Sequence, residues 1–268
     1  MPNDTVAGRA VRMAVDGETV LDRVAGDAGQ AVWCEAPRPV GTGEQAWCWQ
    51  DETGEVLAEL VWSPGLGLTV PRAHFRRGQA VHASRELDLF HRVGTLLAGH
   101  DLTGAAEVRA WRWRLDRPGS WDAALALLAA VMAAHGPQSA GRGWVLELPG
   151  WRDAHDHSPF WAGFGAHFYA EQSPWAAHDA LLLTRPQGWM DRLRVGEAWS
   201  SALRALWPQQ LVYVDFLPEP ARAALGRPHE ALAGLPERLR ALGWRCSPYV
   251  RLDDGGPVWL WGEEPAAG

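Results

Sequence analysis

A strand–helix–strand pattern in the middle of the chain constrains the fold more than any other feature. Residues 107–115 alternate as a strand does, and residues 143–148 form a second apolar strand pattern. Between them, residues 121–135 are rich in Ala and Leu and lack internal Gly or Pro, which predicts a helix with Ser120 as its N-cap. Parallel neighbouring strands need a crossover of this kind, so we expect residues 107–115 and 143–148 to pair in parallel.

The remaining pattern predicts strands first and a mixture of strands and helices afterwards. Further strands are expected at residues 9–15, 45–50, 55–62, 79–87, 93–97, 244–252 and 258–261, and further helices at 16–24, 159–168, 197–206, 219–225 and 236–242. Residues 51–54 are expected to form a hairpin turn in which Gly54 takes a positive φ, and residues 64–78 a Gly/Pro-rich connection. The first half is therefore expected to form a meandering antiparallel sheet. The whole pattern predicts one α/β (α+β) domain over residues 1–268, with a mixed sheet, a loop-rich connection at 26–44 and a flexible tail at 262–268.

Composition narrows the class of function. The formal net charge of -7 argues against a broad nucleic-acid surface or an anionic membrane surface, so small-molecule ligands are expected. The three cysteines carry no CxxC spacing, which indicates neither a disulfide frame nor a zinc site. No signal peptide is visible, and the longest apolar run, residues 123–134, is too short to span a bilayer. The expected location is the cytoplasm.

Five short runs, in order and with matching separations over about residues 45–262, resemble the arginine N-succinyltransferase family of the GNAT superfamily. The runs are VHASREL at 81–87, HDLTG at 100–104, SPFW at 158–161, GRPH at 226–229 and DDGGP at 253–257. The resemblance implies a GNAT-like acyl-CoA N-acyltransferase fold and transfer of succinyl from succinyl-CoA to the α-amine of arginine. It implies no permanently bound cofactor, since the acyl-CoA is a cosubstrate.

The chain departs from the family pattern at two positions that concern chemistry. An Arg-x-x-Gly-x-Gly loop, whose backbone N–H groups bind the CoA pyrophosphate, is reduced here to Asp-Arg-Pro-Gly-Ser at 116–120. The family's Glu-x-Arg-Gly is Glu-Leu-Pro-Gly at 147–150, so an arginine is missing. The N-terminal region and the C-terminal extension are also shorter than is common in the family.

Acyl transfer needs a donor for the thioester oxygen and an acid for the leaving thiolate. The resemblance implies that His229 is the proton donor, whereas without it His229 is a cap or a surface group. A backbone N–H near Trp111 is the expected oxyanion donor, although the Trp111 side chain itself either contacts the acyl group or packs in the core. The pyrophosphate is expected at the helix N-terminus, against Gly119, Ser120 and Trp121, with Arg117 as the only nearby side-chain cation.

Substrate contacts are expected from charged residues and one hydroxyl. Arg85, on a strand, is a candidate for the succinyl carboxylate or an exposed arginine. Candidates for the arginine acceptor are Glu147, Asp153 and the turn residues Asp253 and Asp254, with Ser158 in a matched run; turn carboxylates are also common local caps. The Asp/His cluster at 153–157 is not expected to hold a metal, because its spacing places neighbours on opposite sides of a loop.

Three hypotheses follow from these residues. The first is an active CoA-dependent N-acyltransferase that acts on arginine or a related amino acid. The second is a weakly active or inactive paralogue that serves as a partner subunit or binding protein in a homo- or hetero-oligomer. The third is a small-molecule N-acetyltransferase that uses acetyl-CoA.

Overall fold

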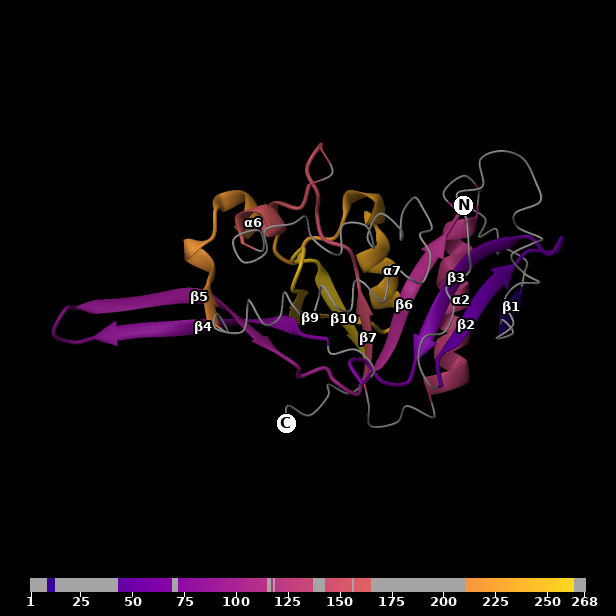
Figure 1. The fold of residues 1–268 in the computed structure, drawn as a ribbon, viewed down its shortest axis with the longest axis horizontal. Coiled ribbons are helices and arrows are strands. Elements are labelled where there is room, and N and C mark those ends of the chain that lie inside the picture. Colours follow the sequence, from indigo (N-terminus) through magenta and orange to yellow (C-terminus); the bar gives the residue numbers. More distant parts are fainter. Residues whose placement is uncertain are drawn as a thin grey trace.

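The computed structural model describes residues 9–12, 43–68, 72–114, 117, 119–136, 143–155, 157–164 and 211–262. Within them, one mixed sheet of ten strands has the order β1-β2-β3-β6-β7-β10-β9-β4-β5-β8 (Figure 1). The strands are β1 (Arg9–Arg12), β2 (Gln45–Gln50), β3 (Val56–Ser63), β4 (His74–Ser84), β5 (Leu89–Gly99), β6 (Ala106–Trp113), β7 (Trp144–Glu147), β8 (Leu211–Tyr213), β9 (Arg245–Arg251) and β10 (Pro257–Trp261). The expected helices at 16–24 and 197–206, most of the connection at 26–44 and the tail after Gly262 lie outside the described residues.

The strand–helix–strand unit is confirmed. β6 and β7 pair in parallel with Ala106 opposite Trp144 and Val108 opposite Leu146, and α2 (Ser120–His135) joins them. One face of α2 is fully buried, with Leu127 and Leu128 at 0% exposure. This helix therefore packs its apolar side on the sheet, as its composition predicts.

The strands β1, β2 and β3 form the expected antiparallel meander, and β3 then pairs with β6. The turn between β2 and β3 follows from two residues. Gly54 has φ 86°, a left-handed conformation that glycine adopts without steric cost. Asp51 accepts hydrogen bonds from the backbone N–H groups of Thr53 and Glu55 at 2.8 and 2.9 Å, which closes the turn.

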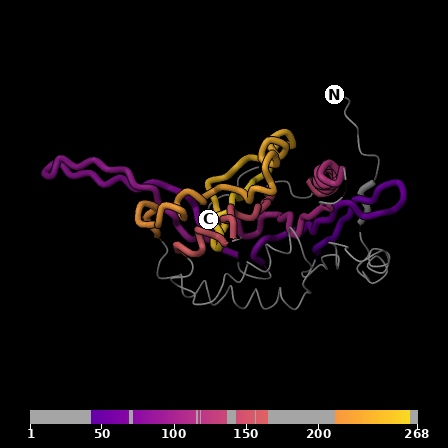
Figure 2. The backbone as a smooth tube through the Cα atoms, turned by 90° about the horizontal axis from the view of Figure 1, so that it is seen from above, coloured from indigo at the N-terminus to yellow at the C-terminus, as the bar shows by residue number. Residues whose placement is uncertain are grey.

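The hairpin of β4 and β5 differs from the expectation in position and length. It does not continue the meander after β3; instead β4 pairs with β9, on the far side of β10. It is also longer than its two expected strands, and a turn at residues 85–88 ends β4 at Ser84 rather than at residue 87. Its outer half projects beyond the rest of the described elements (Figures 1 and 2). Solvated strands show little apolar alternation, so their bounds were poorly specified by the sequence.

Helices cover the sheet in two groups. α2 and α7 (Leu235–Ala241) contribute to one apolar cluster and lie on the same side of the sheet (Figure 2). The short helices α3 (Pro159–Gly163) and α6 (Glu219–Ala224) pack together near β4, β5 and β9. The shared core is rich in tryptophan, including Trp144, Trp244 and Trp259. In the described part of the chain, no helix has the length and apolarity to cross a membrane.

Candidate active site

A cleft opens between β6 and β7 because the two strands stop pairing. Their parallel ladder ends where Val108 faces Leu146, although both strands continue beyond this point. On its other side β6 carries a β-bulge opposite β3, and Ala110 within it has φ 51°. A bulge adds a residue, bends the strand and interrupts its ladder. The resulting cleft holds about 390 Å³ of space open to solvent, and its walls include Ala110, Trp111, Glu147 and Pro149.

Trp111 contributes to this cleft mainly through its position in the strand. Its indole Nε1 donates a hydrogen bond of 3.2 Å to the backbone oxygen of Ala124 in α2, and the side chain is 6% exposed. The ring therefore belongs to the core beneath the cleft, the second of the two roles expected for it. Beyond Val108, β6 no longer pairs with β7, and residues 109–111 of this stretch line the open space.

The N-terminus of α2 is organised differently from the expectation. Gly119, with φ 80°, is the N-cap, and Ser120 is the first helical residue rather than the cap. The Ser120 hydroxyl donates to the backbone oxygens of Arg114 and Arg117, the latter at 2.9 Å, so it fastens the preceding loop instead of capping the helix. The Trp121 ring lies against Trp113, with ring centroids 4.9 Å apart.

Two arginines, not one, stand near this helix end, and a protein carboxylate already holds both. Arg117 Nη2 and Arg114 Nη1 each lie 2.9 Å from the same Glu55 oxygen. Arg117 is 49% exposed and Glu55 31% exposed. The expected pyrophosphate cation is therefore present, but it is paired within the chain.

His229 is anchored to the wall of the cleft. Its backbone N–H donates to the Pro149 oxygen at 2.8 Å, directly after β7. Its side chain caps the 3₁₀ helix η5 (Glu230–Leu232), because Nδ1 accepts from the Ala231 N–H at 3.1 Å. This contact assigns the proton of the neutral ring to Nε2. His229 therefore has the capping role expected as one alternative, and its Nε2 carries the hydrogen that a proton donor needs.

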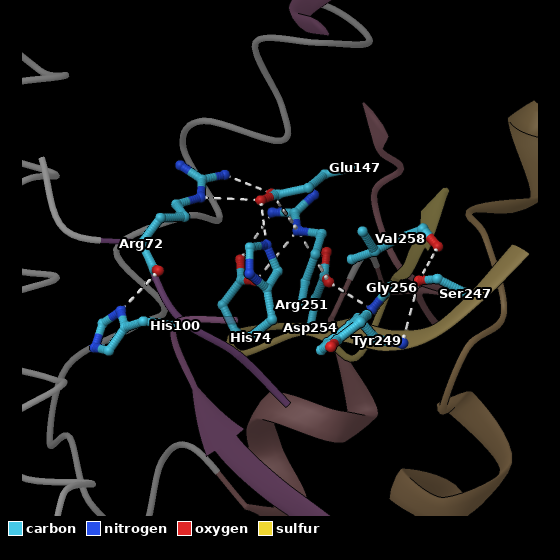
Figure 3. Close-up of polar contacts among 11 residues, drawn as sticks. Arg72, His74, His100, Glu147, Ser247, Tyr249, Arg251, Asp254, Gly256 and Val258 are labelled. Atoms are coloured by element: carbon cyan, nitrogen blue, oxygen red, sulfur yellow. Dashed lines mark hydrogen bonds and ion pairs between the residues drawn. The ribbon is translucent and has the colours of Figure 1, made fainter. Parts of the chain in front are cut away.

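A buried ion cluster surrounds Glu147 at the end of β7 (Figure 3). Arg72 binds Glu147 in a bidentate manner, with Nε–Oε1 3.0 Å and Nη2–Oε2 2.5 Å. His74 Nε2 lies 2.8 Å from Glu147 Oε1. Both carboxylate oxygens that were expected to bind a substrate guanidinium therefore contact side chains of the protein itself.

The cluster continues into the turn between β9 and β10. Arg251 Nη2 lies 2.9 Å from Asp253 Oδ2, and both side chains are 4% exposed. Asp254 accepts backbone N–H groups of Gly150 and Gly256 at 2.8 Å each, which ties the turn to the chain after β7. At Gly150 an added Cβ would lie 2.5 Å from the Asp254 carbonyl oxygen, so glycine alone fits this approach.

Burial and charge shift the carboxyl groups of the cluster in opposite directions. Burial alone would raise the pKa of Glu147, but the charge of Arg72 and the hydrogen bond from His74 hold that pKa well below its usual range. Burial raises the pKa of Asp253 to about 6, with Arg251 opposing and Asp254 adding to the rise. Burial likewise raises the pKa of Glu107 on β6, against the charge of Arg72. Of these three carboxyl groups, Glu147 therefore ionises at the lowest pH.

Three expected substrate contacts lie elsewhere. Arg85 is in the turn at the exposed tip of the β4–β5 hairpin, not on a strand. Asp153 is exposed and accepts the backbone N–H groups of His155 and His157 at 2.8 and 3.0 Å, the local cap that turn carboxylates often form. Ser158 caps α3 by accepting the Trp161 N–H at 3.2 Å. The structure thus joins Glu147 and Asp254 but not these three.

Sequence reasoning missed Arg72, His74 and Arg251. Arg72 and His74 fall in residues 64–78, which were expected to be a connection, and Arg251 lies on an expected strand with no motif around it. The signal in the sequence is that these charged residues stand next to apolar residues of strands. A charged side chain that is buried among such residues needs a partner of opposite charge. Among the described residues, no group of three His, Cys, Asp or Glu side chains is placed to hold a metal ion.

A mixed sheet whose two parallel central strands are joined by a helix and part around a cleft defines the acyl-CoA N-acyltransferase fold. A solved structure of this fold, titled arginine/ornithine succinyltransferase subunit AI from Pseudomonas aeruginosa, superposes with a TM-score of 0.66 and 22% identity, over 96% of this chain and 77% of that one. The family model described as "Arginine N-succinyltransferase beta subunit" matches residues 48–260, and the chain belongs to this family.

Curated relatives carry the same name. Arginine N-succinyltransferase of Yersinia enterocolitica is 29% identical over 226 residues, which is 82% of this chain and 60% of the relative. That of Yersinia pestis (strain Pestoides F) is 30% identical over 223 residues, 81% of this chain and 59% of the relative. The chain thus spans about 60% of the length of these relatives.

Proposed function

We propose that the protein is a CoA-dependent N-acyltransferase that transfers succinyl from succinyl-CoA to the α-amine of arginine. The observation that carries the proposal is the cleft between β6 and β7, which the bulged strand β6 lines on one side and Pro149, the backbone partner of His229, lines on the other. Family membership and the names of the relatives support the choice of succinyl and arginine. Succinyl-CoA acts as a cosubstrate that leaves after each turnover.

In this mechanism the acyl group enters the cleft with its thioester oxygen towards the backbone of β6. An N–H of the unpaired stretch around Trp111 stabilises the oxyanion, which any residue except proline can do. His229 Nε2 supplies the proton to the departing CoA thiolate, whose conjugate acid has a pKa of about 8.5. The pyrophosphate lies at the first turn of α2, against Gly119, Ser120 and Trp121.

The test is a calorimetric titration with succinyl-CoA and with acetyl-CoA, followed by an assay of CoA thiol release with arginine. We expect binding of succinyl-CoA and arginine-dependent release of thiol. Preference for acetyl-CoA in both measurements would favour the N-acetyltransferase hypothesis instead. Binding of neither would overturn the proposed activity.

Replacement of His229 tests the proton transfer. Loss of a general acid typically lowers turnover by about 10²–10⁴-fold, so His229→Ala should lose activity in that range while it keeps its affinity for succinyl-CoA. His229→Gln should not restore activity, because an amide donates a hydrogen bond but does not relay a proton. Turnover of His229→Ala within about threefold of the parent would assign His229 to capping alone.

A second candidate function is a weakly active or inactive partner subunit. The contact that favours it is Glu55, which already occupies both arginines beside the N-terminus of α2. The word "subunit" in the names of the family and of the solved structure fits such a role. Light scattering of the purified protein, alone and mixed with an active family member, would detect the homo- or hetero-oligomer that this hypothesis requires.

A further inference from the structure

His74 is buried, and one of its ring nitrogens has no hydrogen-bond partner among the described residues. Its Nε2 contacts Glu147 at 2.8 Å, while the side chain is 2% exposed. Among the residues that the structure describes, none forms a hydrogen bond with His74 Nδ1. A buried polar atom without a partner costs free energy, so such an atom calls for a ligand or another explanation.

The contact of His74 Nε2 with Glu147 determines which kind of group His74 Nδ1 can bind. Glu147 is an ionised carboxylate and only accepts hydrogen bonds, so the His74 Nε2 that faces it carries the ring proton. The neutral ring then presents a lone pair at Nδ1. A partner for this nitrogen must be an N–H or O–H donor, such as an amine or ammonium group.

A second cavity lies at this histidine. Its cavity volume is about 10 Å³, enough for about one water-sized group, and its lining includes His74, Glu147, Arg251 and Asp253. Glu147 lines this cavity and also the cleft between β6 and β7. A small group held beside His74 would therefore lie next to a carboxylate that also borders the acyl cleft.

We propose that this cavity receives the amino group of the acceptor and that His74 Nδ1 removes its proton, with Glu147 as the residue that positions the imidazole. In this arrangement Glu147 orients the imidazole of His74, and Nδ1 of that imidazole accepts a hydrogen bond from the acceptor amine. A carboxylate fixes the tautomer of a catalytic histidine in the same way at other sites. The inference rests on the proposed acyltransferase function and extends it to a residue that no sequence motif marks.

The proton balance is complete with the groups already named. The acceptor ammonium gives one proton to His74 Nδ1, and the neutral amine forms an N–C bond with the thioester carbon. The C–S bond then breaks, and the sulfur leaves with its electron pair. The second proton lost by the amine is taken up by His229 Nδ1, which releases the Ala231 N–H, while His229 Nε2 gives its own proton to the thiolate. His74 returns its proton to solvent.

Other charged groups face His74 and Glu147 from each element packed around them. They are Arg72 before β4, Glu107 on β6, Arg251 at the end of β9, and Asp253 and Asp254 in the following turn. The two arginines favour the ionised form of Glu147 but, as like charges, oppose a positive charge on His74; the Glu147 carboxylate in contact with His74 favours the imidazolium that forms after proton transfer.

The experiment compares two acceptors in the parent and in His74→Gln. Arginine is protonated at pH 7 and needs a base, whereas methoxyamine is neutral at pH 7 and does not. With arginine, His74→Gln should lower the rate of CoA thiol release by about 10²-fold or more at pH 7, and the deficit should shrink as pH rises. With methoxyamine the rate should stay within about threefold of the parent. His82→Gln, on the exposed part of the same strand, is the matched control and should not distinguish the acceptors.

An equal loss with both acceptors, or no loss with arginine, would overturn the role of His74. His74→Asn offers the same comparison with a smaller amide if His74→Gln does not fold. A parent protein that transfers no acyl group to either amine would overturn the proposed function and this inference with it. An active parent whose His74 variants show no acceptor dependence would overturn this inference alone.

Discussion

The end of β7 and the N-terminus of α2 each pair arginines with a glutamate, but in opposite surroundings. At β7, Glu147 is 9% exposed and meets Arg72, which is 75 residues away along the chain. At α2, Glu55 and Arg117 are 31% and 49% exposed. Glu147 and Arg72 come together only once the sheet has formed, whereas Glu55 and Arg117 remain partly in water.

This difference in burial indicates which of the two regions contributes more to the stability of the fold. Removing one partner of a buried ion pair leaves a charge without compensation and is strongly destabilising. An exposed pair contributes little, because water and salt screen it. The buried cluster should therefore control stability, and the exposed Arg117 should remain available for ligands at small cost.

The largest effect is expected for Glu147→Ala. It leaves Arg72 and part of Arg251 without their carboxylate, so the free energy of unfolding should fall by about 3–5 kcal/mol. Urea denaturation followed by circular dichroism measures it. Asp122→Ala, which removes the exposed pair with Arg238 in the first turn of α2, is the matched control and should cost less than about 1 kcal/mol. Equal losses for the two variants would remove the contrast between the regions.

A smaller effect, dependent on pH, is expected for Asp253→Asn. The folded-state pKa of Asp253 is about 6, above its ordinary 3.8, so the folded protein holds this proton more tightly than the unfolded chain. The stability contributed by this group therefore falls as pH rises from about 4 to about 6. Asp253→Asn should lack this fall, so its stability relative to the parent should rise over that window by up to about 3 kcal/mol.

Unfolding free energies of both proteins at pH 4 and pH 7 measure the shift. Asp122→Asn, in the exposed first turn of α2, is the control and should show no gain of this size. If Asp253→Asn gave the same difference from the parent at both pH values, the ionisation of Asp253 would play no part in the stability of the cluster.

The smallest effect on stability is expected for Arg117→Ala. The free energy of unfolding should change by less than about 1 kcal/mol, because the pair with Glu55 is exposed. Its affinity for succinyl-CoA should nevertheless fall about two- to fivefold, the usual contribution of one charge contact near a helix terminus. Unchanged affinity in a calorimetric titration would exclude the pyrophosphate from this end of α2.

What the sequence predicted depended on how local the determining interactions are. The helix α2, the parallel pair β6–β7 and the turn after β2 each follow from contiguous residues, such as Gly54 in its left-handed conformation, and all three were predicted. The placement of β4 beside β9 was not predictable, because nothing within either strand identifies a partner so far along the chain.

The same reasoning applies to the site. His229 was found because it stands in a run shared with a family, and Glu147 because it is a carboxylate at the end of an expected strand. His74 and Arg72 were missed because their chemistry arises only when β4, β7 and β9 meet, and a lone histidine in an expected connection carries no signal of burial. The N-cap was misplaced by one residue, since Gly119 and Ser120 are both acceptable caps and only the loop geometry separates them.

The strand order also determines when, during translation, the buried ion cluster can form. β9 and β10 lie between β7 and β4, which precede them in the chain and are therefore made earlier. Roughly 180 residues separate Arg72 from Arg251, so Arg251 is made about 10–40 s after Arg72 at ordinary rates of translation. Until then the nascent chain can form its two hairpins and the β6–α2–β7 unit, but β4 and β7 remain unbridged. A stalled or truncated product would thus keep its helices and hairpins and lack the buried ion cluster.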